Sequence, residues 1–248
     1  MRLIHRTLAT VAATVTALSV VAVAAADAAV AKGTAGAVVG APNHKISNST
    51  STNWSGYAVT GGTYKSVTAS WVEPAVSCSG TAYSSFWVGI DGDTSGTVEQ
   101  TGTEADCNGS TPVYSSWYEM YPKFPTNYPD QVAPGDHFTS TATTDGKGNF
   151  TLTLSNTSRG WTESVTKRLK SARLASAEVI AEAPSSSGGV LPLANFGTAS
   201  FSGTKVNGST LTSSTAGIDP ITMQSGTTVK AQPSGISNGA FTVTWKHS

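Results

Sequence analysis

The stretch from Phe138 to Ser155, FTSTATTDGKGNFTLTLS, decides the fold class. On both sides of the segment Asp145–Asn149, apolar and polar residues tend to alternate. An alternation of period two predicts strands with one buried face, and Asp-Gly between two such runs predicts a β-hairpin. The stretch therefore predicts two antiparallel strands, Phe138–Thr144 and Phe150–Ser155, joined by a tight turn.

Similar short runs fill the chain after residue 53. They are rich in Val, Thr and aromatic residues and are separated by Gly, Pro, Asn, Asp or Ser. The further predicted strands are Tyr57–Val59, Ser66–Val72, Ser85–Ile90, Val113–Tyr121, Trp161–Leu169, Thr198–Phe201, Thr227–Ala231 and Phe241–Trp245. Because long helical periods are nearly absent, we expect an all-β fold, an antiparallel sandwich or barrel with little helix.

The N-terminus predicts export. Residues 1–28 combine a basic start, an Ala/Val-rich run and an A-x-A site at Ala26–Ala28, which together indicate a secretory signal peptide of bacterial type. A membrane anchor fits less well, because the run is near the lower length limit for spanning and contains Thr and Ser. Residues 29–52 have no apolar period and predict a flexible spacer or short pro-segment. We expect residues 53–248 to form one secreted domain that no membrane holds after signal removal.

The charge balance is nearly neutral. The chain has 15 basic and 15 acidic residues, and only 12% of it is charged. Residues 1–52 contain four of the basic side chains and one of the acidic ones, so 11 and 14 remain, a net charge of −3. This formal charge gives no reason to expect nucleic acid as a partner.

Two cysteines, Cys78 and Cys107, are the only ones in the chain. In an oxidising compartment such a pair is most simply one disulfide. A metal site would need further ligands, and the four histidines are scattered along the sequence. We therefore predict a disulfide and no metal.

The segment Ser176–Pro184, SAEVIAEAP, fits either a helix or a strand. Glu178 and Glu182 share a side in both cases. In a helix their Cβ atoms would be about 5–6 Å apart, close enough for a carboxylate dyad. In a strand they would be about 13 Å apart, so that Glu182 would need another partner.

The residues argue against several catalytic classes. No G-x-S-x-G nucleophile elbow occurs, and His137, the histidine well inside the domain, follows a probable turn. A cysteine nucleophile would conflict with the predicted disulfide. Dinucleotide and phosphate-loop patterns are missing. One turn, Asp93–Ser95, faintly resembles an aspartic peptidase turn, but that class needs two. What remains is carboxylate and amide chemistry: a Glu as general base and acid, with a Gln amide donating to an oxyanion.

Four short motifs occur along the chain in this order: FWVGIDG (Phe86–Gly92), EQTGTE (Glu99–Glu104), WYEMYP (Trp117–Pro122) and AEVIAEAP (Ala177–Pro184). With NWSGY and ASWVEP before them, they resemble the glutamic peptidases, also called eqolisins, from Asn53 to the C-terminus. The resemblance implies a concanavalin-like sandwich of two large antiparallel sheets. It also implies a monomeric endopeptidase for protein or peptide substrates, active in acid without metal or cofactor.

By position in these strings, Gln100 resembles the catalytic Gln and Glu182 the catalytic Glu. The resemblance favours the strand for Ser176–Pro184, with Glu182 facing Gln100. The hypothesis is that ionised Glu182 takes a proton from a water shared with Gln100, and that the Gln100 amide donates to the oxyanion. An unperturbed Glu titrates near ~4.3, which matches acidic conditions.

Six further residues are predicted to support the site. Asp91, Glu104 and Glu119 are expected to hydrogen-bond around Gln100, although Asp91 also fits a plain turn. Trp87, Tyr121 and Trp54 are expected to line the substrate cleft, and both tryptophans equally fit a core.

Some residues depart from the fungal pattern of this family. Met120 stands where Trp is common, Ser115 where Asp is common, and Glu104 where the family has a shorter Asp. A basic run, Lys167–Arg173, fits a solvated face, an activation site or a contact for acidic peptides. The alternative function is a secreted carbohydrate-binding or glycan-hydrolysing sandwich.

Overall fold

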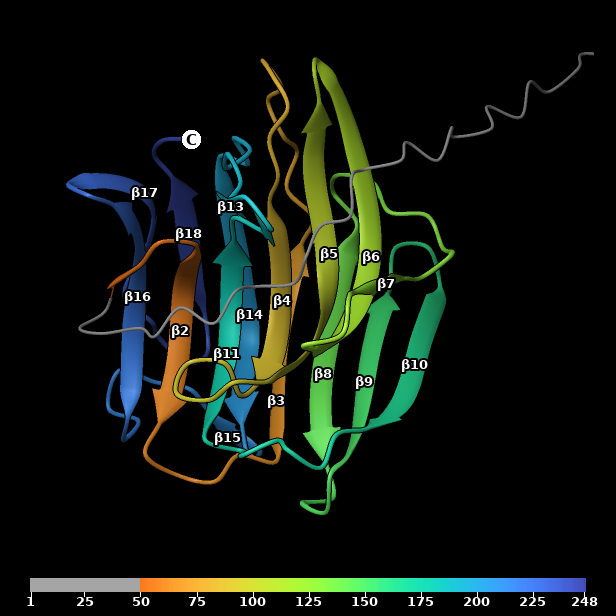
Figure 1. The fold of residues 1–248 in the computed structure, drawn as a ribbon, viewed down its shortest axis with the longest axis vertical. Coiled ribbons are helices and arrows are strands. Elements are labelled where there is room, and N and C mark those ends of the chain that lie inside the picture. Colours follow the sequence, from red (N-terminus) through yellow and green to blue (C-terminus); the bar gives the residue numbers. More distant parts are fainter. Residues whose placement is uncertain (1–49) are drawn as a thin grey trace, which may run out of the picture. The chain divides into compact units, whose positions relative to one another are not determined.

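The computed structural model describes residues 50–248, so the predicted signal peptide and residues 29–49 of the predicted spacer lie outside the described part. Within it, all regular structure is β (Figure 1). The strands are β1 (Thr50–Ser51), β2 (Trp54–Thr60), β3 (Ser66–Val72), β4 (Ser85–Ile90), β5 (Val98–Asn108), β6 (Thr111–Tyr121), β7 (Thr126–Asn127), β8 (His137–Thr144), β9 (Asn149–Asn156), β10 (Trp161–Arg168), β11 (Ser176–Glu182), β12 (Ser185–Ser186), β13 (Gly189–Val190), β14 (Thr198–Val206), β15 (Ser209–Thr210), β16 (Ile218–Ser225), β17 (Thr228–Pro233) and β18 (Phe241–Trp245). Residues 50–248 include no helix that is long and apolar enough to cross a bilayer.

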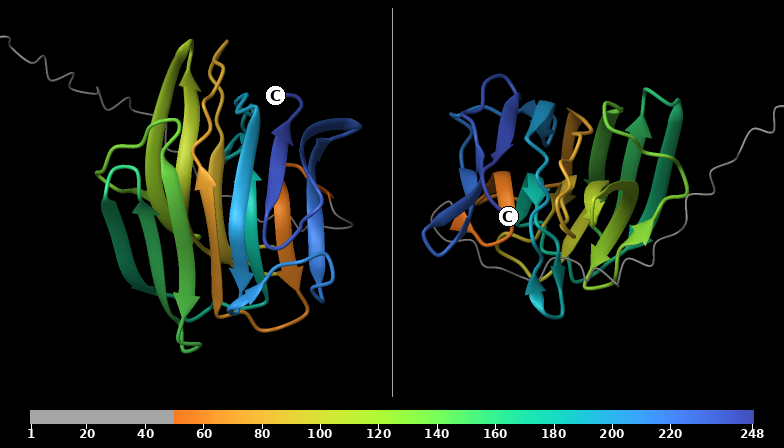
Figure 2. Two further views of the ribbon diagram at one scale, coloured as in Figure 1. Left: turned by 180° about the vertical axis from the view of Figure 1, so that it is seen from behind. Right: turned by 90° about the horizontal axis from the view of Figure 1, so that it is seen from above.

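The strands form two layers packed face to face (Figure 2). The front sheet has the order β16-β2-β11-β4-β5-β6-β7, and the rear sheet has the order β10-β9-β8-β3-β14-β18-β17. The two sheets are continuous through β16, which pairs with β2 over Ile218–Ile221 and with β17 from Met223 onward. All these pairings are antiparallel, whereas the short β1 pairs with β16 in parallel. The predicted sandwich is therefore confirmed, with its sheets joined along one edge.

The core between the sheets follows from the alternation in the sequence. In β9 the apolar residues Phe150, Leu152 and Leu154 are fully buried, and the intervening Thr residues are half-buried. Phe138 of β8 stacks on Trp71 of β3 with ring centroids 5.9 Å apart. One face of each strand thus supplies the apolar surface whose burial stabilises the fold.

Three sequence predictions about local structure are confirmed. The hairpin at Asp145–Asn149 joins β8 to β9, and Cys78 is bonded to Cys107. The ambiguous segment Ser176–Pro184 contains a strand, β11, which pairs with β2 and β4. The helix, and with it a Glu178–Glu182 dyad, is excluded.

Two long strands were not predicted. β5 contains Glu, Gln, Asp and Gly, and β16 contains Pro220, which are residue types that strands disfavour. β5 nevertheless forms because it pairs along its whole length with β6 and buries most of its residues. Tertiary burial overrides the local propensity here.

Carboxyl groups lie in the core without cationic partners. Glu99 of β5 is fully buried, and neither of its carboxyl oxygens has a hydrogen-bond partner in the described part of the chain. Burial, reinforced by Asp91, raises the pKa of Glu99 to about 9. Glu73 is equally buried, and burial raises its pKa to about 8 although Thr103 and Trp71 donate hydrogen bonds to it. Folding therefore favours the protonated forms of both groups.

We predict that the protein is most stable in acid and that Glu99→Gln is stabilising near neutrality. The unfolded carboxyl ionises above its ordinary pKa of 4.5 while the folded one keeps its proton, so the free energy of unfolding falls as pH rises toward 9. At pH 7 this single group costs about 3 kcal/mol. Urea unfolding should show wild type and Glu99→Gln equal near pH 3, with the variant more stable near pH 7. A difference that does not change with pH would contradict the interpretation.

Candidate active site

The candidate site lies on the face of the front sheet that points away from the rear sheet, called here the site face. The strand register brings side chains there into rows. Glu182 of β11 lies opposite Ser85 of β4, and Glu104 of β5 follows in the same row. Gly89, which follows Ser85 by four residues in β4, lies opposite Gln100 of β5. These two rows hold the predicted Gln and Glu on the same face.

Glu182 is fixed by two hydrogen bonds. Asn53 Nδ2 donates to Oε1 over 2.9 Å, and Trp87 Nε1 donates to Oε2 over 2.8 Å. Asn53 is held in turn by Ser51, whose hydroxyl donates to Asn53 Oδ1 over 3.1 Å. Glu182 is only 3% exposed, and burial raises its pKa to about 8 although both donors favour the ionised form. The carboxyl is therefore held in place by two donors and is neutral in acid.

Gln100 is fixed by Glu119. Gln100 Nε2 donates to Glu119 Oε2 over 2.6 Å, so one N–H of the amide is used and the other stays free. Gln100 Oε1 and Glu119 Oε1 are buried and have no partner among the described residues. Burial raises the pKa of Glu119 to about 8, and the charge of Glu182 adds to this increase. The electrostatic interaction shows that the Gln100–Glu119 pair and Glu182 lie within reach of each other's fields.

Trp87 connects the two rows. Its indole N–H contacts Glu182, while its ring lies over Gly89 beside Gln100. A Cβ at position 89 would come within 2.9 Å of Trp87 Cζ3 and 3.1 Å of Gln100 Cβ. Glycine at this position therefore makes room for the indole that spans from Glu182 toward Gln100.

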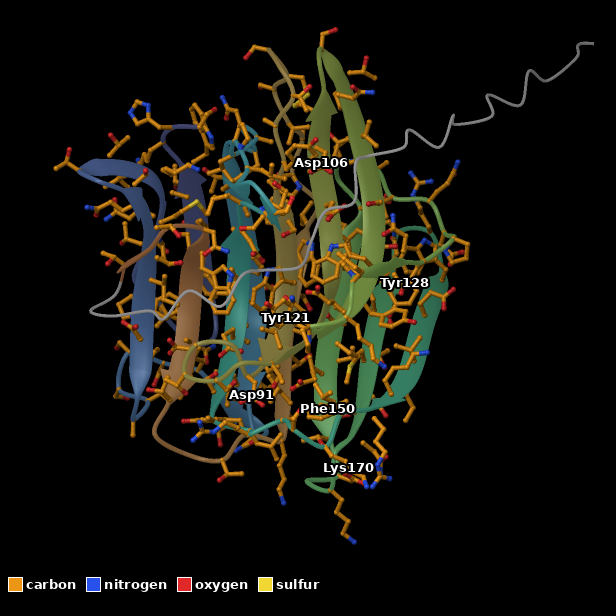
Figure 3. The ribbon with its side chains drawn as sticks, viewed as in Figure 1. Asp91, Asp106, Tyr121, Tyr128, Phe150 and Lys170 are labelled. Carbon is orange, nitrogen blue, oxygen red and sulfur yellow. A yellow bond between two sulfur atoms is a disulfide. The ribbon has the colours of Figure 1, made fainter. Side chains whose placement is uncertain are left out.

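Further aromatic residues pack around Trp87. Trp54 packs edge-on against Trp87 with centroids 5.0 Å apart, and Tyr121, labelled in Figure 3, packs against the same buried cluster. The cluster also contains Trp117 and Ile180 and is separate from the core between the sheets. The indole N–H group of Trp117 has no partner among the described residues. Trp54, Trp87 and Tyr121 thus belong to one cluster on the site face, and their role in lining a substrate cleft stays a prediction.

Glu104 lies near Gln100 but does not bond to it. Its Oε2 accepts a hydrogen bond from Ser115 over 3.1 Å, and burial raises its pKa. Its charge also raises the pKa values of Glu119 and Glu182. Glu104 therefore acts on the site through its field.

Asp91 has a structural role in a turn, which is the alternative that the sequence also allowed. Its carboxylate accepts hydrogen bonds from the backbone N–H groups of Arg173, Leu174 and Ala175, each over 2.8 Å. It stands in a turn with φ of 69° and fixes the loop that leads into β11 (Figure 3). Its contacts position the strand of Glu182, and Gln100 is not among the partners of its carboxylate.

Glu178 shares a row with Gln100, because both lie opposite Gly89. The carboxyl groups that shift the pKa of Glu178 nevertheless differ from those that interact with Glu182. Burial raises the pKa of Glu178 well above the ordinary value, and Asp93, Asp91 and Glu99 add to this. Glu182, in contrast, interacts with Glu104 and Glu119. The choice of Glu182 over Glu178 as the partner of Gln100 stays a prediction from the order of the motifs.

Sequence reasoning missed two residues of this site. Asn53 and Ser51 hold Glu182 from a segment that the prediction placed at the domain boundary. The only signal was the string NWSGY, in which Asn53 precedes a buried Trp. Among residues 50–248, no group of three or more His, Cys, Asp and Glu side chains is arranged to hold a metal ion.

Several known proteins are similar to this chain. The model of the Peptidase A4 family matches residues 52–245. Aspergillopepsin-2 of Aspergillus niger is 29% identical over 132 residues, which are 44% of this chain and 47% of that protein. Scytalidopepsin B of Scytalidium lignicola is 36% identical over 104 residues, 40% of this chain and 39% of that protein. The chain thus aligns with less than half the length of these curated relatives.

The fold has a solved counterpart. A crystal structure of scytalido-glutamic peptidase with a transition state analog inhibitor superimposes with a TM-score of 0.70. The match covers 79% of this chain and 98% of that one, with 24% sequence identity. At this identity the likeness concerns the fold.

We predict that the indole N–H of Trp87 reports the ionisation of Glu182. Its NMR chemical shift should titrate with a midpoint near the pKa of about 8 given by burial. Asn53→Leu should raise this midpoint, because the variant removes a donor that favours the carboxylate. Glu182→Gln is the control and should abolish the titration, while Trp87→Phe assigns the signal. An unchanged midpoint in Glu182→Gln would show that another group is being observed.

Proposed function

Because this chain belongs to the Peptidase A4 family, we propose that it is a secreted endopeptidase that cleaves peptide bonds in acid with Gln100 and Glu182 and needs no metal or organic cofactor. The observation that carries the proposal is the restraint of both side chains on one buried face. Asn53 and Trp87 hold Glu182, and Glu119 holds Gln100. Secretion is supported by the Cys78–Cys107 disulfide and by the sequence of residues 1–28.

The protonation state of Glu182 changes the mechanism inferred from sequence alone. An ordinary Glu would be partly ionised near pH 4, whereas burial raises the pKa of Glu182 to about 8. In acid the group is therefore a neutral carboxyl, which can donate a proton from one oxygen and accept one at the other. The active form in this proposal is the neutral acid.

Attack by water then proceeds without a separated charge. Glu182 gives its proton to the oxygen of the peptide carbonyl, and its other oxygen takes a proton from the attacking water. The new C–O bond gives a neutral gem-diol. Gln100 orients the water through its unpartnered Oε1, and its free N–H donates to the oxygen that develops charge during the transfer.

Collapse of the gem-diol repeats the exchange in reverse. Glu182 protonates the leaving nitrogen and takes a proton from one gem-diol hydroxyl while the C–N bond breaks. The products are a carboxylic acid and an amine, and Glu182 recovers its starting form. Because each step moves two protons in opposite directions through one carboxyl, the restraint of Glu182 by two donors matters for the rate.

Hydrolysis is tested first with general substrates. We expect the purified protein to degrade casein or denatured globin at about pH 3–4, where a raised carboxyl pKa keeps Glu182 protonated. Pepstatin and EDTA should leave the rate unchanged, because the proposed chemistry uses neither an aspartic dyad nor a metal. Inhibition by either compound, or no cleavage at all, would refute the proposal.

Glu178→Gln and Glu182→Gln form a matched pair of variants. Both residues lie buried on the same face of β11, so each substitution removes one carboxyl from a similar environment. Glu182→Gln should lower kcat by about 10²–10⁴-fold, and Glu178→Gln should remain close to wild type. Circular dichroism of both variants checks the fold. The opposite ranking of activities would assign the reaction to Glu178.

The pH profile distinguishes the neutral carboxyl from the carboxylate. If neutral Glu182 is the active form, kcat/KM for an uncharged peptide stays level in acid and falls as pH rises through the raised pKa of Glu182, about 8. If the carboxylate were the base, kcat/KM would instead rise tenfold per pH unit over the acidic range. Stability is monitored in parallel, because ionisation of Glu99 and Glu73 also destabilises the fold at high pH.

A further inference from the structure

The folded chain presents a different charge from the one its composition gives. Residues 50–248 contain 11 basic and 14 acidic side chains, yet ten of the basic ones are exposed and Asp145 alone of the acidic ones is fully exposed. Asp145 is itself engaged, because it accepts hydrogen bonds from Lys147 N, Asn149 N and Asn149 Nδ2 in its own turn. Five further carboxyl side chains are half-buried, so the exposed residues of the described part carry an excess of positive charge although the formal charge is −3.

Five of these exposed cations gather at one end of the sandwich, around the β8–β9 hairpin. This group, called here the basic end, comprises Lys65, Lys147, Arg168, Lys170 and Arg173. Lys65 Nζ lies 3.3 Å from the point that a Cβ would occupy at Gly146 of the hairpin. Lys170 Cα lies 3.2 Å from the corresponding point at Gly148, and Figure 3 shows Lys170 at this end of the molecule.

Backbone contacts hold the basic end together. Leu169 N donates to Gly148 O over 2.8 Å, which joins the end of β10 to the hairpin. Tyr64 N donates to Leu174 O over 2.9 Å, which brings the loop of Arg173 beside Lys65. The cations thus come from three separate segments that the fold assembles.

One exposed carboxylate, Asp145, lies within the basic end, where its hydrogen bonds and the charge of Lys147 lower its pKa, so the five cations remain in excess. The ion pair found within residues 50–248 joins Arg159 to Asp136, and it involves none of the five cations. Protection of the edge strand β10 accounts for Arg168 alone, since the other four cations lie on loops and turns or at their junctions with strands. A cluster of five cations from several segments, with a single exposed carboxylate among them, is suited to bind a polyanion.

We propose that the basic end binds a linear phosphodiester polymer without bases, of the poly(glycerol phosphate) type, and so holds the protein near such a polymer. The acidic conditions in which we predict the fold to be most stable decide the kind of anion. Free Asp and Glu carboxylates lose their charge near pH 4, whereas phosphodiesters remain charged there. Stacking residues would be needed for bases, and the exposed large apolar residues of the described part, Val72, Val113 and Phe124, lie outside the basic end.

This proposal corrects an inference from composition and is independent of the proposed peptidase activity. The formal charge of −3 gave no reason to expect a phosphate-bearing partner, because it counted carboxyl groups that the fold buries. Binding at the basic end needs neither Gln100 nor Glu182. Loss of one function would therefore leave the other testable.

The experiment measures binding of the full-length protein to soluble poly(glycerol phosphate) at about pH 4 over a range of salt. Each phosphate contact contributes about 0.7 to the slope of log affinity against log salt for a flexible single chain. In the double variant Lys147→Gln, Lys170→Gln, the magnitude of this slope should fall by about 1.4. The variant should also bind about tenfold more weakly at low salt. The matched control, Lys123→Gln with Lys246→Gln, removes the same net charge elsewhere and should bind like wild type.

Two further probes distinguish the source of the phosphodiester. Poly-glutamate should bind weakly at this pH, and an oligodeoxythymidine should bind no more tightly than poly(glycerol phosphate) of equal charge. Clearly tighter binding of the oligonucleotide would overturn the choice of polymer in favour of nucleic acid. Equal weakening by the control variant, or no binding of poly(glycerol phosphate) at low salt, would overturn the basic end as the binding surface.

Discussion

The rest of the structure depends on burying carboxyl groups without cations beside them. Eight of the fourteen carboxyl side chains in residues 50–248 are buried, and the single ion pair found there uses only Asp136. Burial without a positive partner favours the protonated form, as the raised pKa values of Glu73, Glu99, Glu119 and Glu182 show. The fold is therefore built for a proton-rich solvent, in which these groups are neutral and cost little to bury.

In the proposed mechanism, the same constraint gives the site its chemistry. Glu182 lies where two donors stabilise its carboxylate and burial opposes ionisation, and burial prevails. A buried carboxyl that keeps its proton is a poor base but a good bifunctional catalyst, since it can exchange two protons at once. Trp87 makes the arrangement possible because its indole fits over Gly89 and reaches Glu182 with its N–H group. Backbone register, one glycine and one indole thus place the acid with respect to Gln100.

How much of this could be predicted depends on whether the signal was local. Strands with clear alternation or β-branched residues, such as β3, β4 and β18, have the predicted bounds. The disulfide followed from a count of cysteines, whereas the assignment of Gln100 and Glu182, made from the order of motifs, stays a prediction. β5 was missed because its charged residues argue locally against a strand, although they are its contribution to the site. Asn53 was missed because its contact with Glu182 joins residues 129 positions apart. Burial, the source of every raised pKa here, is a property of the whole fold.

The distribution of charge extends this argument from the interior to the surface. A chain with few charged residues that buries its acids must present its bases to solvent, because the cost of burying an unpaired ammonium or guanidinium group resembles that of a carboxylate and protonation cannot relieve it. A buried Glu becomes neutral by taking up a proton, which an acidic solvent favours. Lys and Arg would become neutral only by losing a proton, which an acidic solvent opposes. Lys230 is the one buried cation of the described part, and burial lowers its pKa. The acidic interior and the cationic exterior are therefore two consequences of the same requirement, and a formal net charge computed from composition cannot describe what a partner encounters.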